Sequence, residues 1–225
     1  MPAVVVALIA LCAGIHLMRT VLFTSAQDAE FFVRAAFVPA RYSGRYLIDL
    51  YAFTTPITYS FLHGSWLHLG VNMIWLAAFG SPLAARLGAV RFLAFWVVTS
   101  IAAVALHYVL HANDLAPLVG ASGAISGMMG AAARFGFQID RSGPQPAFRG
   151  RPLPVAAVVR SRAVMTFLAV WMIVNVATGL IGFAPGVSDQ IAWEAHIGGF
   201  LAGLLCFPLL DPAHYDDGPS ETLAS

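Results

Sequence analysis

Long apolar segments alternate with polar connections of different lengths along the chain. A membrane-spanning helix needs about 20 mainly apolar residues, and six segments come near this length. They lie at residues 3–23, 66–82, 92–112, 117–136, 163–183 and 190–210. The second and fourth are short and rich in glycine, yet each is long enough to cross a bilayer. The pattern predicts an all-α polytopic membrane protein: one domain of six transmembrane helices at residues 1–212 and a short cytoplasmic tail at 213–225.

The first apolar segment and the polar stretch after it need separate interpretation. Met1-Pro2-Ala3 carries no basic residue and no clear cleavage site follows, so the segment differs from a secretory signal peptide and counts as a span. The stretch at 24–65 combines arginines with many aromatic residues, and prolines and a glycine interrupt its apolar pieces. It predicts a folded, membrane-associated first loop instead of a disordered tail.

Composition narrows the class of protein. Of the 225 residues, 59% are hydrophobic and 10% are charged, which excludes an ordinary soluble domain. The formal net charge is only +1, and the uneven placement of arginine is typical of a topology signal and not of a nucleic-acid partner. Cys12 and Cys206 lie in apolar segments, where a free thiol packs like a small hydrophobic group. We therefore expect no disulfide and no metal cluster.

The arginines predict the orientation of the chain in the membrane. Eight of the twelve lie in the connections between residues 86 and 162, which share a side with both termini of a six-span protein. Cytoplasmic connections carry an excess of basic residues, so both termini are expected in the cytoplasm. On that side, the stretch at 142–154 is expected to be a solvated linker and the acidic tail from Asp211 to fray. The compact six-span form suggests a bacterial inner (cell) membrane protein.

The fourth segment contains a serine between glycines, in Gly120-Ala121-Ser122-Gly123. Glycines then recur every three or four residues along this segment, and small residues let membrane helices approach closely. Taken alone, this repeat favours packing. The alternative is chemical, because glycines beside a serine leave room for a substrate and free N–H groups at a helix start stabilise an oxyanion.

Polar residues in two other segments bear on this choice. His68 and Asn72 are four residues apart, hence on one face of the second segment, and His196 lies near the start of the sixth. Each alone could be a satisfied interior residue, although polar groups within a membrane often mark a functional site. With a rise of 1.5 Å per residue, all of these groups and Ser122 lie on the order of 5 to 12 Å below the outer ends of their helices. One layer is therefore predicted to hold them.

That layer contains the groups needed for acyl transfer. His196 is placed to take the proton of Ser122 as a general base and return it to the leaving amine. His68, Asn72 and the Ser122 backbone N–H would donate to the oxyanion. Glu194 lies on another side of its helix from His196, so we predict a catalytic dyad without an acidic third member.

Ser126 is the competing serine, one turn further along the same segment. Its greater depth and its distance from the unpaired N–H groups at the helix start favour Ser122 as the nucleophile. Ser126 is expected to have a packing role.

These residues resemble the rhomboid family of intramembrane serine proteases. The match lies in three ordered motifs: Gly120-Ala121-Ser122-Gly123, His68-xxx-Asn72 and Ala195-His196-xx-Gly199-xxx-Gly203. The resemblance implies a six-helix rhomboid core with Ser122 as nucleophile, His196 as base and the oxyanion donors named above. It also implies an endopeptidase that cleaves transmembrane protein substrates near their outer ends in the lipid bilayer, without metal or cofactor. Neither the physiological substrate nor the oligomeric state follows from it.

The resemblance assigns further supporting residues and leaves two departures. His63 matches a histidine often found ahead of the second helix and is expected to help structure the loop there. Gly120, Gly123 and Gly199 belong to the matching motifs and are expected to support the site. Ser126 stands where many relatives have an aromatic residue that stacks on the catalytic histidine. The first loop also lacks the Trp-Arg pair of many relatives. The connection at 183–189 is expected to cover the active site.

Other functions fit the residues less well. No histidine is followed by glutamate, so a His-Glu-x-x-His zinc helix is absent, and no aspartate lies deep in a span to build a carboxylate pair. A transporter would show inverted repeats, which the sequence lacks. The remaining alternative is a rhomboid-like protein, catalytically weak or inactive, that binds membrane clients. Such proteins typically lack the serine or the histidine, and this chain has both.

Overall fold

The computed structural model describes residues 1–181 and 192–212 of the chain. Within these residues all the regular elements are helices, and two isolated β-bridges are the only strand-like pairings. The first half of the described chain contains α1 (Ala3–Leu17), η1 (Met18–Leu22), α2 (Ser25–Ala35), η2 (Pro39–Tyr42), α3 (Leu50–Thr58), η3 (Tyr59–Phe61), α4 (Trp66–Trp75), η4 (Leu76–Gly80) and α5 (Ser81–Leu87). The second half contains α6 (Ala89–His111), α7 (Ser122–Ala133), α8 (Val155–Arg160), α9 (Arg162–Ile181) and α10 (Trp193–Leu210).

Four helical stretches are long and apolar enough to cross a membrane, among the residues that the structure describes. They are Ala3–Leu22, Trp66–Leu87, Ala89–His111 and Trp193–Leu210, and they correspond to the first, second, third and sixth predicted segments. The second is longer than predicted because α4, η4 and α5 follow one another without a break. α9 corresponds to the fifth predicted segment. The chain is thus an all-helical, multi-pass membrane protein.

The fourth predicted segment, 117–136, is wrong in its extent. Helix α7 has 12 residues and begins at Ser122. Before it, the backbone of Leu118 pairs with that of Phe37, at 2.7 and 3.1 Å, and Gly120 has a φ of +123°. A positive φ of this kind interrupts a right-handed helix, so the residues just before Ser122 form a non-helical segment that leads into α7.

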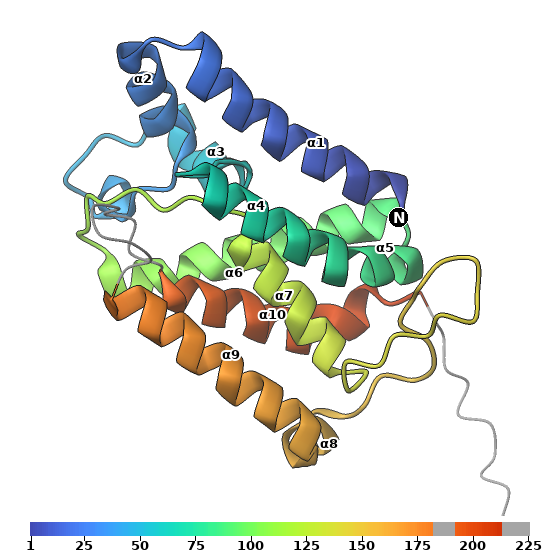
Figure 1. Cartoon of the computed structure of the whole chain (residues 1–225). Coiled ribbons are helices and arrows are strands. Elements are labelled where there is room, and N and C mark those ends of the chain that lie inside the picture. Colours follow the sequence, from blue (N-terminus) through green and yellow to red (C-terminus); the bar gives the residue numbers. More distant parts are fainter. Residues whose placement is uncertain (182–191, 213–225) are drawn as a thin grey trace, which may run out of the picture.

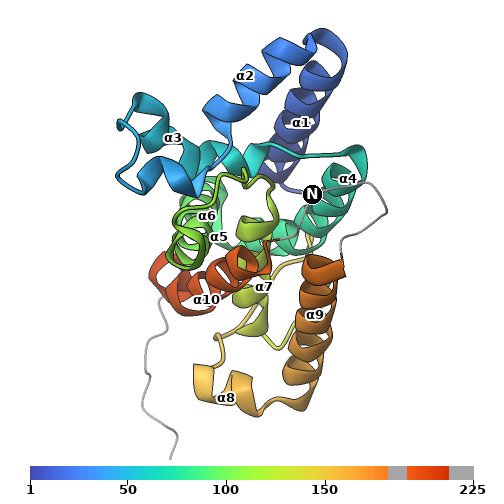
Figure 2. The same cartoon turned by 90° about the vertical axis from the view of Figure 1, so that its left-hand side faces the viewer.

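Helix α7 lies in the centre of the molecule, with α4, α6 and α10 around it (Figure 2). Its residues 123–133 are all buried. Two glycines of α10 press directly on its backbone: a Cβ atom on Gly199 would lie 2.0 Å from the oxygen of Gly123, and one on Gly203 would lie 1.9 Å from the oxygen of Gly127. Since no side chain fits there, glycine at both positions brings α10 to backbone contact with α7.

The first loop is folded, as predicted. The Thr24 side chain and Gln27 form a reciprocal cap at the start of α2, and Asp49 caps α3 through the backbone N–H of Ala52 at 3.0 Å. The Thr58 hydroxyl donates to the carbonyl oxygen of Ala35 at 2.8 Å, which joins α3 to α2. Figure 1 shows these short helices together at one end of α1.

The predicted solvated linker at 142–154 is wrong in part. Phe148 is 1% exposed and stacks on Phe135, and Arg86 donates to the Phe148 carbonyl oxygen at 2.9 Å. The same arginine forms a two-point ion pair with Asp211, whose side chain is 3% exposed. Asp211 is therefore fixed in the fold, and the rest of the predicted fraying tail, residues 213–225, lies outside the described part.

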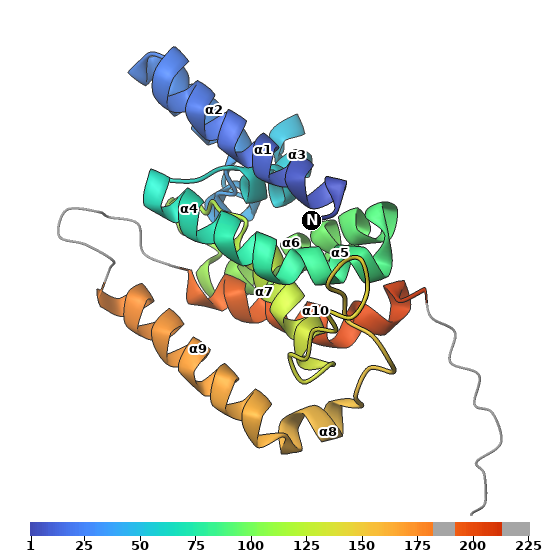
Figure 3. The same cartoon turned by 45° about the vertical axis from the view of Figure 1, so that its right-hand side comes forward.

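Helix α9 lies at the opposite side of the molecule from α1 and is joined to α8 (Figure 3). It meets α10 through the rings of Trp171 and Phe200, whose centroids are 5.5 Å apart. The helix therefore flanks the part of α10 that contains His196.

Candidate active site

The structure brings Ser122 and His196 together. Nε2 of His196 lies 2.7 Å from the Ser122 hydroxyl oxygen, although 74 residues separate them in the sequence. Ser122 is the first residue of α7, and His196 lies in the first turn of α10. The contact of Gly199 with Gly123 is next to this pair and brings the two helix starts close enough for the hydrogen bond.

A residue that the sequence analysis missed contacts the other nitrogen of His196. Oδ1 of Asn175, in α9, forms a short hydrogen bond with His196 Nδ1. The Asn175 side-chain nitrogen donates to the Trp171 carbonyl oxygen at 2.7 Å, which directs the amide oxygen toward the histidine. An amide oxygen only accepts, so Nδ1 carries the proton, and Nε2 of the neutral ring is left to accept from Ser122.

A signal for Asn175 was present in the sequence. It is the only asparagine in the fifth predicted segment, and a polar group among apolar residues of a membrane helix is by default a candidate functional residue. The side chain is largely buried, with 9% of the residue exposed. Its partner could not be identified from spacing alone.

His68 lies against the segment that leads into Ser122. Its Nε2 is 2.8 Å from the position that a Cβ atom on Gly120 would occupy. Glycine is required at position 120 for this close approach as well as for its positive φ. Gly123 is similarly confined, because a Cβ atom there would lie 2.6 Å from the Ala103 methyl group.

Asn72 is buried one turn after His68 on α4. Its side-chain nitrogen donates to the His68 carbonyl oxygen at 3.0 Å. An amide nitrogen has two hydrogens, so this bond uses one of them. The Ser65 hydroxyl caps the same helix by accepting from the His68 backbone N–H at 3.1 Å, which fixes the start of α4 and with it the place of both side chains.

His63 is fully buried where the first loop, α1 and α4 meet. Its carbonyl oxygen accepts from Arg19 at 3.0 Å and lies 3.1 Å from Nδ1 of His16. Its ring lies 5.2 Å from that of His68. Neither ring nitrogen of His63 has a hydrogen-bond partner among the described residues. Burial, followed by the nearby His68, His16 and Arg19 charges, lowers the pKa of His63 to about 3.

This low pKa predicts a loss of stability in acid. A histidine in the unfolded chain has a pKa of about 6.5. Between about pH 6.5 and 3, His63 is therefore protonated in the unfolded chain and neutral in the folded protein. The contribution of neutral His63 to the free energy of unfolding is complete above this pH range and is lost as the pH falls through it. At about pH 4.5 the free energy of unfolding of the wild type should be roughly 2 to 3 kcal/mol lower than at neutral pH because of His63. The thermal midpoint, measured at neutral pH and at about pH 4.5, should fall less on acidification in His63→Gln than in the wild type. An equal fall in the wild type and in His63→Gln would contradict the low pKa of His63.

The two polar residues that the sequence excluded from the catalytic dyad lie apart from the serine–histidine pair. Ser126 is 3% exposed and lies one turn deeper in α7. Glu194 contacts His111 on α6, with 2.9 Å between Oε1 and Nε2, and so lies on another side of α10 from the pair. The connection at 183–189, which is predicted to cover the active site, lies outside the described residues.

Fold and site together define an integral, multi-pass membrane protein with a serine–histidine pair between its helices. Residues 51–211 match the Rhomboid domain, and the chain therefore belongs to the rhomboid family, a family of intramembrane serine proteases.

Two plant proteins are similar to the chain over most of its length. "RHOMBOID-like protein 4" of Arabidopsis thaliana is 30% identical over 157 residues, which are 69% of this chain and 34% of that protein. "RHOMBOID-like protein 5" of the same plant is 30% identical over 152 residues, 66% of this chain and 41% of that protein. The matched region is thus less than half of either relative.

Proposed function

We propose that this protein is an intramembrane serine endopeptidase that hydrolyses peptide bonds in or near the transmembrane segments of other membrane proteins. The observation that carries the proposal is the 2.7 Å contact between the Ser122 hydroxyl and Nε2 of His196 at the start of α7. A serine is a weak nucleophile until a neighbouring base accepts its proton. Membership of the rhomboid family supports the same reaction class.

The proposed reaction has two halves. Ser122 Oγ attacks the substrate carbonyl carbon while its proton passes to His196 Nε2. The carbonyl oxygen becomes an oxyanion, for which the Ser122 backbone N–H, His68 and Asn72 are the proposed donors. The C–N bond then breaks and His196 protonates the leaving amine. His196 then takes a proton from water, which attacks the ester carbon on Ser122. The bond from that carbon to Oγ breaks, and His196 returns the proton to Oγ and restores the serine. The cycle consumes one water molecule for each peptide bond that it cleaves and requires no cofactor.

Asn175 is proposed as a positioning residue in this reaction. It accepts from Nδ1 of His196, and so holds the ring in the orientation and tautomer in which Nε2 accepts from Ser122. The arrangement turns the predicted dyad into a serine–histidine–asparagine series. It also gives the base an orienting partner, the role that the aromatic residue missing at Ser126 would have had by stacking.

Replacing Asn175 should therefore affect the chemical step more than substrate binding. We expect Asn175→Leu to lower kcat about 10- to 100-fold, since misplacement of a reacting group by about 1 Å costs this much, with KM changed less than about twofold. Asn175→Asp keeps an acceptor for Nδ1–H and should recover most of the rate. Ile173→Leu, on the exposed side of α9, is the matched control. Initial rates over a range of substrate concentrations give both constants, and equal losses in the leucine and aspartate variants would contradict the role.

The setting of the reaction is proposed from the arginine distribution. Both termini would lie in the cytoplasm and the active site would open to the outer face of a bacterial inner membrane, with the periplasm beyond it. The six-span topology is part of this proposal. Transmembrane proteins in the same bilayer are the proposed partners, and no nucleic acid is expected to bind.

Cleavage in liposomes tests the proposed function. The purified protein is reconstituted with a panel of tagged single-span proteins, and the products are mapped by mass spectrometry. Cuts within or beside the span, near its outer end, are expected. Co-purification of the single-span proteins without any cleavage would favour the client-binding alternative and overturn the proposal.

A further inference from the structure

Three side chains with metal-binding atoms meet at the end of α6. His107 and His111 are four residues apart on that helix, and Glu194 comes from the first turn of α10. One ligand atom from each residue lies within 4.8 Å of the other two. This cluster, the His107/His111/Glu194 cluster, plays no part in the proposed reaction.

The chemistry of the cluster is that of a transition-metal site. Histidines at i and i+4 share one face of a helix, and their rings are here 4.8 Å apart. Two imidazoles and a carboxylate are a ligand set that zinc takes in proteins, with water in the fourth position. His107 is 8% exposed, and its Nδ1 is buried with no hydrogen-bond partner in the described part of the chain. A buried, unpaired ring nitrogen is costly unless something binds it.

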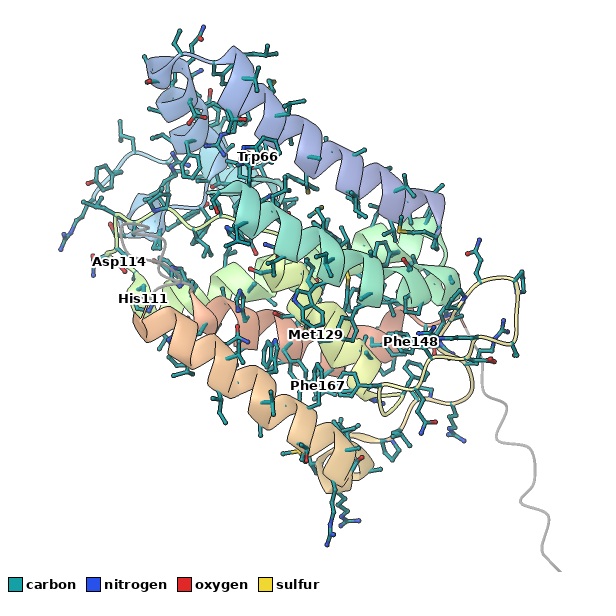
Figure 4. The ribbon with its side chains drawn as sticks, viewed as in Figure 1. Trp66, His111, Asp114, Met129, Phe148 and Phe167 are labelled. Atoms are coloured by element: carbon teal, nitrogen blue, oxygen red, sulfur yellow. The ribbon has the colours of Figure 1, made fainter. Side chains whose placement is uncertain are left out.

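A second carboxylate supports the same interpretation. Oδ2 of Asp114 lies 3.3 Å from Nδ1 of His111, while Nε2 of the same ring faces Glu194. Metal-binding histidines usually donate their other N–H to a carboxylate, which fixes the ring and strengthens it as a ligand. Figure 4 shows His111 and Asp114 beside each other at the end of the molecule. Their side chains are 35% and 56% exposed, so an ion has a route from water.

We propose that His107, His111 and Glu194 bind one divalent transition-metal ion of the zinc class. The ion would link the last turn of α6 to the first turn of α10, two residues before His196. This site is separate from the proposed catalytic groups and does not depend on the proposed protease activity. The sequence predicted no metal cluster because both of its cysteines lie in apolar segments. The present site is not visible as a local motif, since the glutamate is 83 residues from the nearer histidine.

Metal binding to the full chain tests the proposal directly. The protein in detergent micelles is stripped with a chelator and titrated with Co²⁺, whose absorption bands report a tetrahedral site, and then with Zn²⁺ in competition with a chelator of known affinity. One ion per chain is expected. His111→Gln and Glu194→Gln should each weaken binding at least about tenfold, and Asp114→Asn should weaken it about 10-fold, in line with losses seen when a ligand's hydrogen-bond partner is removed.

Two control variants test whether the ion binds at the His107/His111/Glu194 cluster and not elsewhere. Glu30→Gln changes an exposed carboxylate elsewhere, and His196→Ala removes the histidine of the catalytic pair; both should bind as the wild type does. Far-UV circular dichroism of each variant shows that its helices are retained. Absence of binding by the wild type, equal binding by His111→Gln and Glu194→Gln, or loss of binding only in His196→Ala would each overturn the proposal.

Discussion

Replacing either Ser122 or His196 with alanine is expected to abolish substrate cleavage, with a rate at least about 10³-fold below that of the wild type. The two side chains form one hydrogen-bonded unit, with 2.7 Å between them. Without the hydroxyl there is no nucleophile, and without the ring nothing accepts its proton. Because they act as a unit, the double variant should be no slower than the slower single variant.

Ser126→Ala is the matched control for this expectation. It removes the same hydroxyl group one turn deeper in α7, at a residue that is 3% exposed, and should retain cleavage. The measurement is the initial rate on a single-span substrate in liposomes, with protein amount and helix content checked for each variant. A fluorophosphonate that reacts with activated serines should label the wild type and Ser126→Ala but neither Ser122→Ala nor His196→Ala. Loss of both cleavage and labelling in Ser126→Ala alone would move the nucleophile to Ser126.

Local signals in the sequence were sufficient to predict that each member of this pair lies on a helix, but not where each helix begins. Apolar length predicted the long helices, since backbone groups in a membrane are satisfied within a helix. The polar start of α4 was also predictable, because Ser65 is a typical N-cap ahead of Trp66. The extent of α7 was not, because residues 117–121 are apolar enough for a helix. Their extended form comes from pairing with Phe37, about 80 positions earlier.

The contacts of Asn175 and Glu194 show what local signals leave open. An evenly apolar helix such as α9 has no polar face that would indicate its rotation, so the sequence could not tell which side chain meets His196. Glu194 could be excluded from the catalytic pair by its spacing, but its actual partner, His111, is distant in sequence. Phe148 was missed for a similar reason: a loop rich in Gly, Pro and Arg is usually solvated, and only the packing of Arg86 and Phe135 shows that this one is not.

The second large expected effect concerns the close contact between α7 and α10 at Gly199. In Gly199→Ala, the added Cβ would lie 2.0 Å from the backbone oxygen of Gly123. A backbone atom cannot move aside as a flexible side chain does, so α10 must shift away from α7. Overpacking of this kind usually costs about 1 to 3 kcal/mol, and a clash with backbone should reach or exceed the upper value. The same shift separates His196 from Ser122, so cleavage should fall at least about 10²-fold.

Gly70→Ala is the matched control, because it makes the same change within helix α4 at a position with nothing within 4 Å of the added atom. It should keep full activity and have a thermal midpoint equal to or above that of the wild type, since alanine favours a helix over glycine by about 1 kcal/mol. The measurement combines thermal midpoints in detergent with the cleavage rate in liposomes. If Gly199→Ala matched Gly70→Ala in both, α7 and α10 would not be in backbone contact, and the close approach that places His196 against Ser122 would need another cause.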